Sequence, residues 1–156
     1  MEIAVSERRG FATLQFWVPR MPPRKSNNRD VVPVPKKSGP GYKHVPRLSA
    51  KARSYRSTFI TEVRLAAKDL IGSGVCPLHT FLVLDLTISY PSDAHDLSVE
   101  MVQDCLQAAG VIENDNQVRS SCATKTFAED EDCGTWIVVS GLRADHEVRK
   151  RRVKRD

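Results

Sequence analysis

Apolar and polar residues alternate most regularly in the segment TFLVLDLTISY, at positions 80–90. The apolar positions are Leu82, Leu84, Leu86, Ile88 and Tyr90, and the positions between them are Val83, Asp85, Thr87 and Ser89. Successive side chains of a β-strand point to opposite faces, so this pattern predicts a strand with one buried face. Pro91 ends the predicted strand, and the chain then enters a loop at 92–96.

Two segments carry apolar residues at helical spacing instead. The first runs from Ser49, a candidate N-cap, to about Ile71, and its apolar stripe consists of Tyr55, Phe59, Val63, Ala66 and Leu70. The second runs from about Leu97 to Ala109, and Gly110 follows it as a helix terminator. Residues that recur every three or four positions share one face of a helix, so each segment predicts an amphipathic helix.

Three further segments, at 11–18, about 118–127 and 135–142, are predicted to form strands. The predicted order is therefore β-α-β-α-β-β, which describes an α+β domain with a small mixed sheet and two helices. We assign residues 1–142 to this single domain. Residues 143–156 form a basic C-terminal tail.

Proline dominates the segment between the first predicted strand and the first helix. Seven of the nine prolines lie at 19–46, among Lys, Arg, Asn and Gly residues. Proline interrupts regular hydrogen bonding, so residues 19–47 are predicted to form an exposed, basic, extended loop within the domain.

Length and composition are those of an ordinary globular protein. A chain of 156 residues with a 40% hydrophobic fraction can build one core. No apolar run approaches the ~20 residues that span a bilayer, and the first ten residues lack the apolar stretch of a signal peptide. The four cysteines show no CxxC pairing, which favours free thiols over a zinc site or disulfides. These features predict a cytoplasmic protein with no membrane partner.

Charge changes this picture, because its sign is segregated along the chain. Residues 1–56 carry thirteen Lys or Arg against three acids, and residues 143–156 carry seven against three. Between 69 and 118 there are eight acids and no Lys or Arg. Basic segments suit a phosphate backbone, and an acidic centre suits a divalent metal. The pattern favours a metal-dependent nuclease, although acids on a solvated helix face would give the same pattern.

Three aspartates flank the second predicted helix. Asp93 and Asp96 lie where the strong strand meets this helix, and Asp115 lies just beyond the other end. Carboxylate oxygens are the ligands that Mg²⁺ prefers, and a bound Mg²⁺ would activate water for phosphodiester hydrolysis. A helix of about 13 residues is roughly 20 Å long, however. Asp115 can therefore meet Asp96 only if the following loop folds back or a second subunit supplies one of the carboxylates.

Two short motifs resemble the RusA family of Holliday-junction resolvases. Pro22-Pro23 followed by Ser26-Asn27-Asn28-Arg29 resembles the family's proline-then-SNNR pattern. The more specific match is AGVIENDNQV at 109–118, which resembles the family's AG–DD–QV element and places Asp115 on its metal-binding aspartate. The similarity covers most of the chain. It implies a small, dimeric, Mg²⁺-dependent endonuclease, of a kind found mostly in phages and prophages.

The resemblance also implies a set of functional residues. Asp93, Asp96 and Asp115 would be catalytic and would hold Mg²⁺, for which Mn²⁺ is a possible substitute. Branched DNA would be the partner and would contact basic and amide side chains, and the chain would act as a homodimer in the cytoplasm of a bacterial host. The predicted DNA-binding residues are Asn27, Asn28, Arg29, Arg53, Arg56, Arg149, Lys150, Arg151 and Arg152.

The chain departs from the family pattern at the start of the second helix. The family usually has D-x-D-N there and a lysine one turn later, whereas this chain has DAHDLS at 93–98 and Glu100 at the lysine position. Asn114 also replaces the acid that precedes the metal-binding aspartate. Several registers of the motif remain open. Two alternatives therefore stand beside the nuclease: a RusA-like DNA-binding module that has lost its activity, and an interaction protein whose basic tail engages RNA or an acidic partner.

Overall fold

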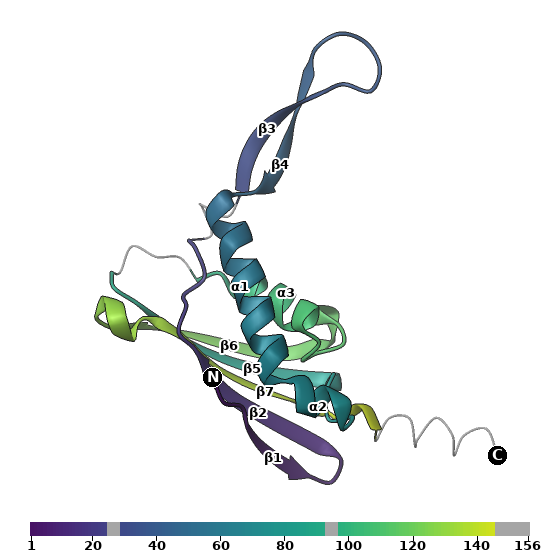
Figure 1. Cartoon of the computed structure of the whole chain (residues 1–156), viewed down its shortest axis with the longest axis vertical. Helices are drawn as coiled ribbons and strands as arrows, with labels where there is room; N and C mark the ends of the chain where they lie inside the picture. The colour runs from purple at the N-terminus through teal and green to yellow at the C-terminus, as the bar shows by residue number, and fades with distance from the viewer. Residues whose placement is uncertain (25–28, 93–96, 146–156) are drawn as a thin grey trace, which may run out of the picture.

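A five-stranded mixed sheet forms the centre of the α+β fold in the computed structural model, which describes residues 1–24, 29–92 and 97–145 (Figure 1). Its strand order is β1-β2-β7-β5-β6, in which β5 and β6 are parallel and all other neighbours are antiparallel. The strands are β1 (Ala4–Arg8), β2 (Phe11–Val18), β5 (His79–Tyr90), β6 (Val118–Phe127) and β7 (Gly134–Leu142).

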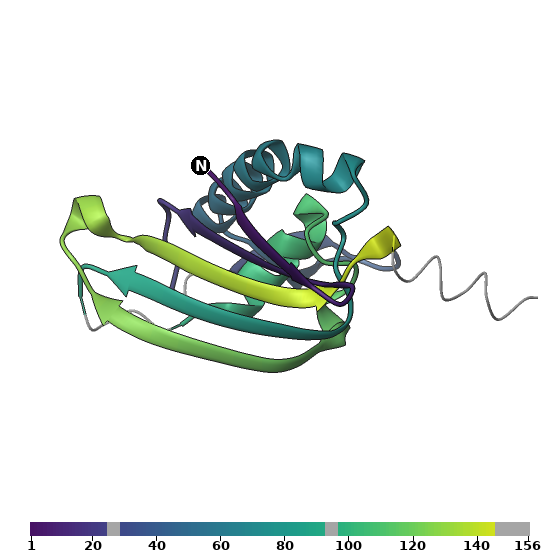
Figure 2. The ribbon, with the colours of Figure 1, turned by 90° about the horizontal axis from the view of Figure 1, so that it is seen from below.

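Helices lie on one face of this sheet (Figure 2). They are α1 (Ala50–Ala66), the short α2 (Lys68–Gly72) and α3 (Val99–Ala109). No helix of the described residues covers the opposite face. The predicted alternation in β5 is confirmed, because Leu82, Leu84, Leu86, Ile88 and Tyr90 are all buried on the helix side. No helix within the described ranges is long and apolar enough to cross a membrane.

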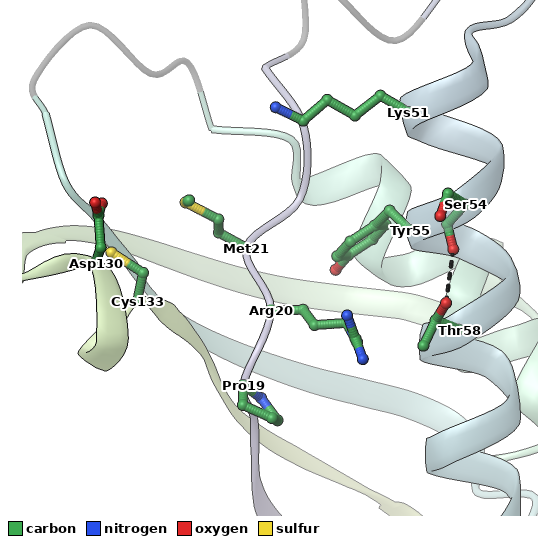
Figure 3. A pocket seen from close by; sticks show the side chains of 9 residues that line it. All are labelled: Pro19, Arg20, Met21, Lys51, Ser54, Tyr55, Thr58, Asp130 and Cys133. Carbon is green, nitrogen blue, oxygen red and sulfur yellow. Dashed lines mark hydrogen bonds between the residues drawn. The ribbon is translucent and has the colours of Figure 1, made fainter.

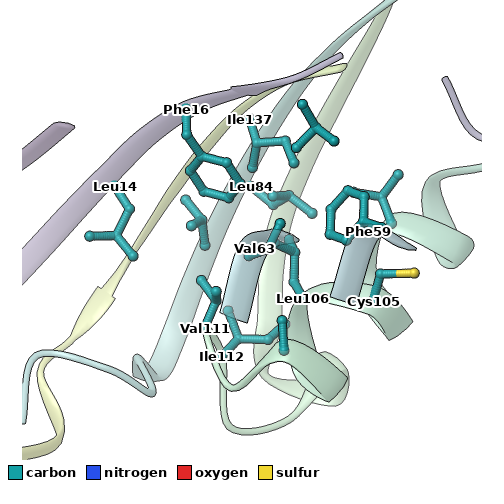
Figure 4. Close-up of a cluster of buried hydrophobic side chains, with 14 of the residues drawn as sticks. Leu14, Phe16, Phe59, Val63, Leu84, Cys105, Leu106, Val111, Ile112 and Ile137 are labelled. Atoms are coloured by element: carbon teal, nitrogen blue, oxygen red, sulfur yellow. The ribbon is translucent and has the colours of Figure 1, made fainter. Parts of the chain in front are cut away.

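The core fills the space between the sheet and the helices (Figure 4). Phe16 of β2 and Leu84 of β5 face Phe59 of α1 and Leu106 of α3, and each of these side chains is at most 1% exposed. Burial of this apolar surface is the main stabilising contribution, at about 25 cal/mol per Å².

Helix boundaries follow the predicted signals, with one interruption. The hydroxyl of Ser49 accepts a hydrogen bond from the backbone N–H of Ala52 at 3.1 Å, which caps α1 as predicted. The single helix predicted to reach Ile71 is instead two, because the backbone at Ala67 leaves the helical conformation. Gly110 ends α3 with φ of +81°, a left-handed conformation that glycine adopts without strain.

The prediction of a loop at 19–47 is wrong for much of that segment. Residues Arg29–Pro35 form β3 and Tyr42–Leu48 form β4, which pair with each other as a separate two-stranded sheet. Figure 1 shows this hairpin projecting away from the body beyond the start of α1. The prolines were misleading because they occupy positions where a two-stranded ribbon needs no N–H donor. Strand β1 was also not predicted.

Free thiols are confirmed for all four cysteines, of which Cys122 alone is exposed. Burial raises the pKa of Cys76 and of Cys105 to about 12. Desolvation and the neighbouring carboxylates Asp130 and Asp132 raise the pKa of the Cys133 thiol.

We therefore expect a thiol reagent at pH 8 to label Cys122 first, because only the thiolate reacts and buried thiols remain protonated. Labelling of the native protein should not exceed one thiol per chain and should reach four after denaturation, as measured by mass spectrometry. Cys122→Ser should remove the fast phase. Rapid labelling of Cys76 or Cys105 in the native protein would contradict the burial described above.

Candidate metal centre and nucleic-acid interface

Asp115 lies in a short turn between α3 and β6. It begins a 3-10 helix, Asp115–Gln117, and its backbone N–H donates a hydrogen bond to Oε1 of Gln107 at 3.3 Å. The side chain of Asn114 accepts a hydrogen bond from the N–H of Asn116 at 2.9 Å and so fixes the start of the turn. Hydrogen bonds therefore hold this turn in place. The side chain of Asp115 is half-buried on it.

A carboxylate and an imidazole that the sequence analysis did not select lie beside this turn. Nδ1 of His79 is 2.7 Å from Oε2 of Glu113, and Nε2 of Gln117 donates to the same oxygen at 3.1 Å. Leu78 accepts a hydrogen bond from the N–H of Glu113 at 3.0 Å, which joins this segment to the start of β5. Glu113 was visible in the matched motif, but its partner His79 lies 34 residues away in sequence.

Asp93 and Asp96 lie outside the described residues. The described residues on either side of that segment are Ser92 and Leu97. Ser92 follows β5 directly, and Leu97 packs partly buried against the core ahead of α3. The N–H of Ala128 donates to the carbonyl of Tyr90 at 3.1 Å, so the acidic turn after β6 lies at the same end of the sheet.

Asp115 and Ser92 lie at opposite ends of the sheet. The parallel pairing of β5 and β6 runs from Leu82 opposite Val118 to Tyr90 opposite Phe127. Asp115 precedes this paired region and Ser92 follows it. Eight residue steps along a strand span about 26 Å. The turn that holds Asp115 stays at the end of α3, and β6 then runs back toward the Ser92 end of the sheet. Within the described ranges, no three His, Cys, Asp or Glu side chains are grouped so as to hold a metal ion.

Further carboxylates lie at the Ser92 end of the sheet. Glu129 and Asp130, together with Pro91 and Phe127, line an open depression of about 570 Å³. Neither acid was predicted as a site residue. In the structure they share this depression with Pro91, which directly follows β5.

A second cleft, of about 430 Å³, separates α1 from the chain that follows β2 (Figure 3). Asp130 and Cys133 lie on one side of Met21, and the α1 side chains lie on the other. Tyr55 forms part of the cleft wall, and desolvation raises its pKa well above the usual value. Asp115 is not among the residues that line this cleft.

An ion pair ties the chain after β2 to α1. Arg20 contacts the Glu62 carboxylate through two hydrogen bonds of 2.8 and 3.2 Å. These bonds lower the pKa of the Glu62 carboxyl group. The side chains of Arg20 and Glu62 are 42% and 34% exposed, so solvent screens the pair and we expect only a small contribution to stability.

Three predicted DNA-binding residues gather where the hairpin meets α1. Arg29 begins β3, and Arg53 and Arg56 lie on the first turns of α1; all three are exposed. Nη1 of Arg53 donates to the carbonyl of Leu48 at 2.5 Å, which links α1 to the end of β4. The other predicted contacts, Asn27, Asn28, Arg149, Lys150, Arg151 and Arg152, lie outside the described residues.

The structure thus contains exposed arginines at the base of the hairpin and, on a separate turn, the half-buried Asp115 with the carboxylate Glu113 beside that turn. Comparison of the chain with protein-family models and with curated proteins finds no match.

Proposed function

We propose that this protein is a Mg²⁺-dependent endonuclease that cuts branched DNA, with a RusA-like fold and activity. The observation that carries the proposal is the turn that contains Asp115. The segment of most specific resemblance, residues 109–118, forms the junction of α3, the turn and β6, and it holds Asp115 half-buried at the sheet edge. The exposed arginines at the base of the hairpin support a polyanionic substrate.

The proposed site requires two subunits. Asp115 and the flanks of Asp93 and Asp96 lie at opposite ends of β5, so one chain does not bring them together. A two-fold axis perpendicular to β5 would reverse the strand direction in the partner. The Asp115 end of one subunit would then approach the Ser92 end of the other. We therefore propose a homodimer, which also suits the paired cuts that resolve a four-way junction.

The face of the sheet that the described helices leave uncovered supports this association. Its outward side chains on β2, β7 and the Val83–Ser89 part of β5 include a single charged residue, Asp85. Trp136 and Val83 are each 41% exposed on this face. Depletion of charge and enrichment of tryptophan are features of protein interfaces, and a phosphate backbone would require basic residues there instead.

The ion, Mg²⁺ or Mn²⁺, would be held by carboxylate oxygens of Asp93 and Asp96 from one subunit and of Asp115 from the other. Carboxylate oxygens are suitable ligands for these hard cations. The bound ion would offset charge on the phosphoryl oxygens and lower the pKa of a bound water. The turn at Asn114 and Gln107 would keep the Asp115 carboxylate oriented. Basic side chains would hold the DNA backbone, with no preference for sequence.

Cleavage of a labelled four-way junction in Mg²⁺ tests the proposal. We expect symmetric nicks from the wild type and at least a 100-fold lower rate from Asp115→Asn, since even indirect partners of a metal site change activity about 10–100-fold. Asp69→Asn, an exposed aspartate on α2, is the matched control and should cut at the wild-type rate.

An uncut junction at high enzyme excess, in Mg²⁺ and in Mn²⁺, would overturn the nuclease proposal. Tight junction binding without cleavage would identify the alternative, a DNA-binding module that has lost activity. Glu100 at the family's lysine position and Asn114 in place of an acid favour that alternative as the second candidate.

A further inference from the structure

The β3–β4 hairpin, residues 29–48 with its connecting loop at 36–41, is exposed on both faces. Most of its strand residues are exposed, and Val31 and Tyr42 are each 65% exposed. Two-stranded hairpins are marginally stable in water, and a ribbon that buries so little apolar surface adds little to the core. We therefore expect its role to lie in contacts outside the chain.

Its charge is strongly one-sided. The hairpin contains five Lys or Arg residues and one acid. Lys36 and Lys37 begin the connecting loop, Lys43 follows it on β4, and all three are exposed. The loop turns through Gly39 and Gly41, whose φ angles are +81° and +104°. The end of the hairpin farthest from the body thus presents three lysines and no acid at 36–43.

The edges of the hairpin are poorly suited to pairing with another strand. The N–H of Lys36 donates to the carbonyl of Gly41, so this pair is hydrogen-bonded and alternate pairs along the ribbon are not. Pro33, Pro35 and Pro46 all fall in the alternate pairs, where an N–H would point outward. Three outward donors are therefore missing, which disfavours binding of a protein partner by strand addition.

The dimensions of the hairpin match a DNA groove. Neighbouring strands lie about 4.8 Å apart, and a strand of seven residues spans about 24 Å. A two-stranded ribbon fits the major groove of B-DNA, which is about 12 Å wide. The major groove of A-form RNA is too deep and narrow for this contact.

We propose that the β3–β4 hairpin enters the major groove of one duplex arm of the branched DNA, with Lys36, Lys37 and Lys43 against the flanking phosphates. This inference rests on the proposed function in taking branched DNA as the substrate. It assigns a distinct task to the hairpin, which is to grip a duplex arm away from the point of cleavage.

The test compares wild type with the triple variant Lys36→Gln, Lys37→Gln and Lys43→Gln in equilibrium binding to a four-way junction, in EDTA so that no cleavage occurs. Each phosphate contact contributes about 0.9 to the slope of log K against log salt concentration, so the slope should fall by about 2–3. Affinity near 150 mM salt should fall at least tenfold.

The matched control removes the same charge elsewhere, by Arg8→Gln, Arg9→Gln and Lys68→Gln, all exposed on β1, the turn after it and α2. It should weaken binding less than threefold and leave the slope nearly unchanged. Equal losses in the two triple variants, or an unchanged slope in the hairpin variant, would overturn the proposal. Equal competition by duplex RNA would also overturn it, since that ligand lacks an accessible major groove.

This assay separates the two proposals. If the salt slope of the hairpin variant falls by about 2–3 but the wild type does not cleave in Mg²⁺, the proposed role of the hairpin is supported and the proposed nuclease activity is rejected. Normal cleavage together with an unaffected slope would reject the hairpin alone. A reagent tethered at Ser38→Cys in a Cys122→Ser background should cleave DNA within one duplex arm, and reaction at the branch point instead would contradict the proposed placement.

Discussion

Phe59→Ala is expected to lower the free energy of unfolding by about 3–5 kcal/mol, the usual cost of truncating a buried aromatic residue. Phe59 is fully buried near the middle of α1, between the sheet and α3 (Figure 4). Its ring lies 5.6 Å from that of Tyr55, centroid to centroid. Removal of the ring would leave a cavity that the rigid sheet cannot close, and the aromatic contact would be lost with it.

Urea unfolding followed by circular dichroism measures this effect. Phe127→Ala is the matched control, because it removes the same side chain where it is 70% exposed at the end of β6. The control should change stability by no more than about 0.5 kcal/mol. Similar midpoints for the two variants would contradict the core described here. Since Phe59 lies away from the hairpin, the variant should retain DNA binding at temperatures where it is folded.

The elements predicted from sequence are those with one covered face. Strand β5 packs its even-numbered side chains under α1 and α3, so burial imposes the alternation seen in the sequence. Helix α3 shows its stripe for the same reason, and its terminator Gly110 has the expected conformation. Each of these segments can be predicted from its own residues, because the spacing of its apolar positions matches the face that the fold buries.

Two parts of the fold, β1 and the β3–β4 hairpin, were not predicted because neither has one buried face. All five residues of β1 are exposed, so no alternation is present to detect. The hairpin is exposed on both sides, and its prolines suggested a loop. Only the register of β3 against β4 shows that Pro33 and Pro35 occupy positions where their missing N–H does not disturb pairing.

The candidate site depended even more on tertiary arrangement. Helix length alone predicted that Asp115 would lie far from the residues at the start of α3. The parallel pairing of β6 with β5, which sets Asp115 at the far end of the sheet from Ser92, was not encoded in any local pattern. The contact between His79 and Glu113 likewise joins residues 34 positions apart.

The proposed two-subunit site leads to a sharp expectation for mixtures of inactive variants. Asp115→Asn and Asp96→Asn should each be inactive as homodimers, because every site in them lacks one carboxylate. In a mixed dimer with sites built across subunits, one site combines the intact Asp96 of the first chain with the intact Asp115 of the second. The other site carries both substitutions. Activity should therefore reappear on mixing.

The fraction of activity recovered on mixing follows from random assembly of the two variants into dimers. Half of the dimers would be mixed and each would hold one intact site of two, so about a quarter of the wild-type sites would return. A four-way junction should receive single nicks rather than paired cuts, as resolved on denaturing gels after the two variants are unfolded and refolded together. Mixed dimers can be verified with a different affinity tag on each variant. If verified mixed dimers stay inactive, the proposed site across two subunits is wrong. The three aspartates would then have to act within one chain, although the flanking residues Ser92 and Leu97 do not indicate how they could meet. Recovery would instead make the two-fold association itself a requirement for activity, because the Asp115 turn of one chain would then serve the Asp93–Asp96 segment of the other.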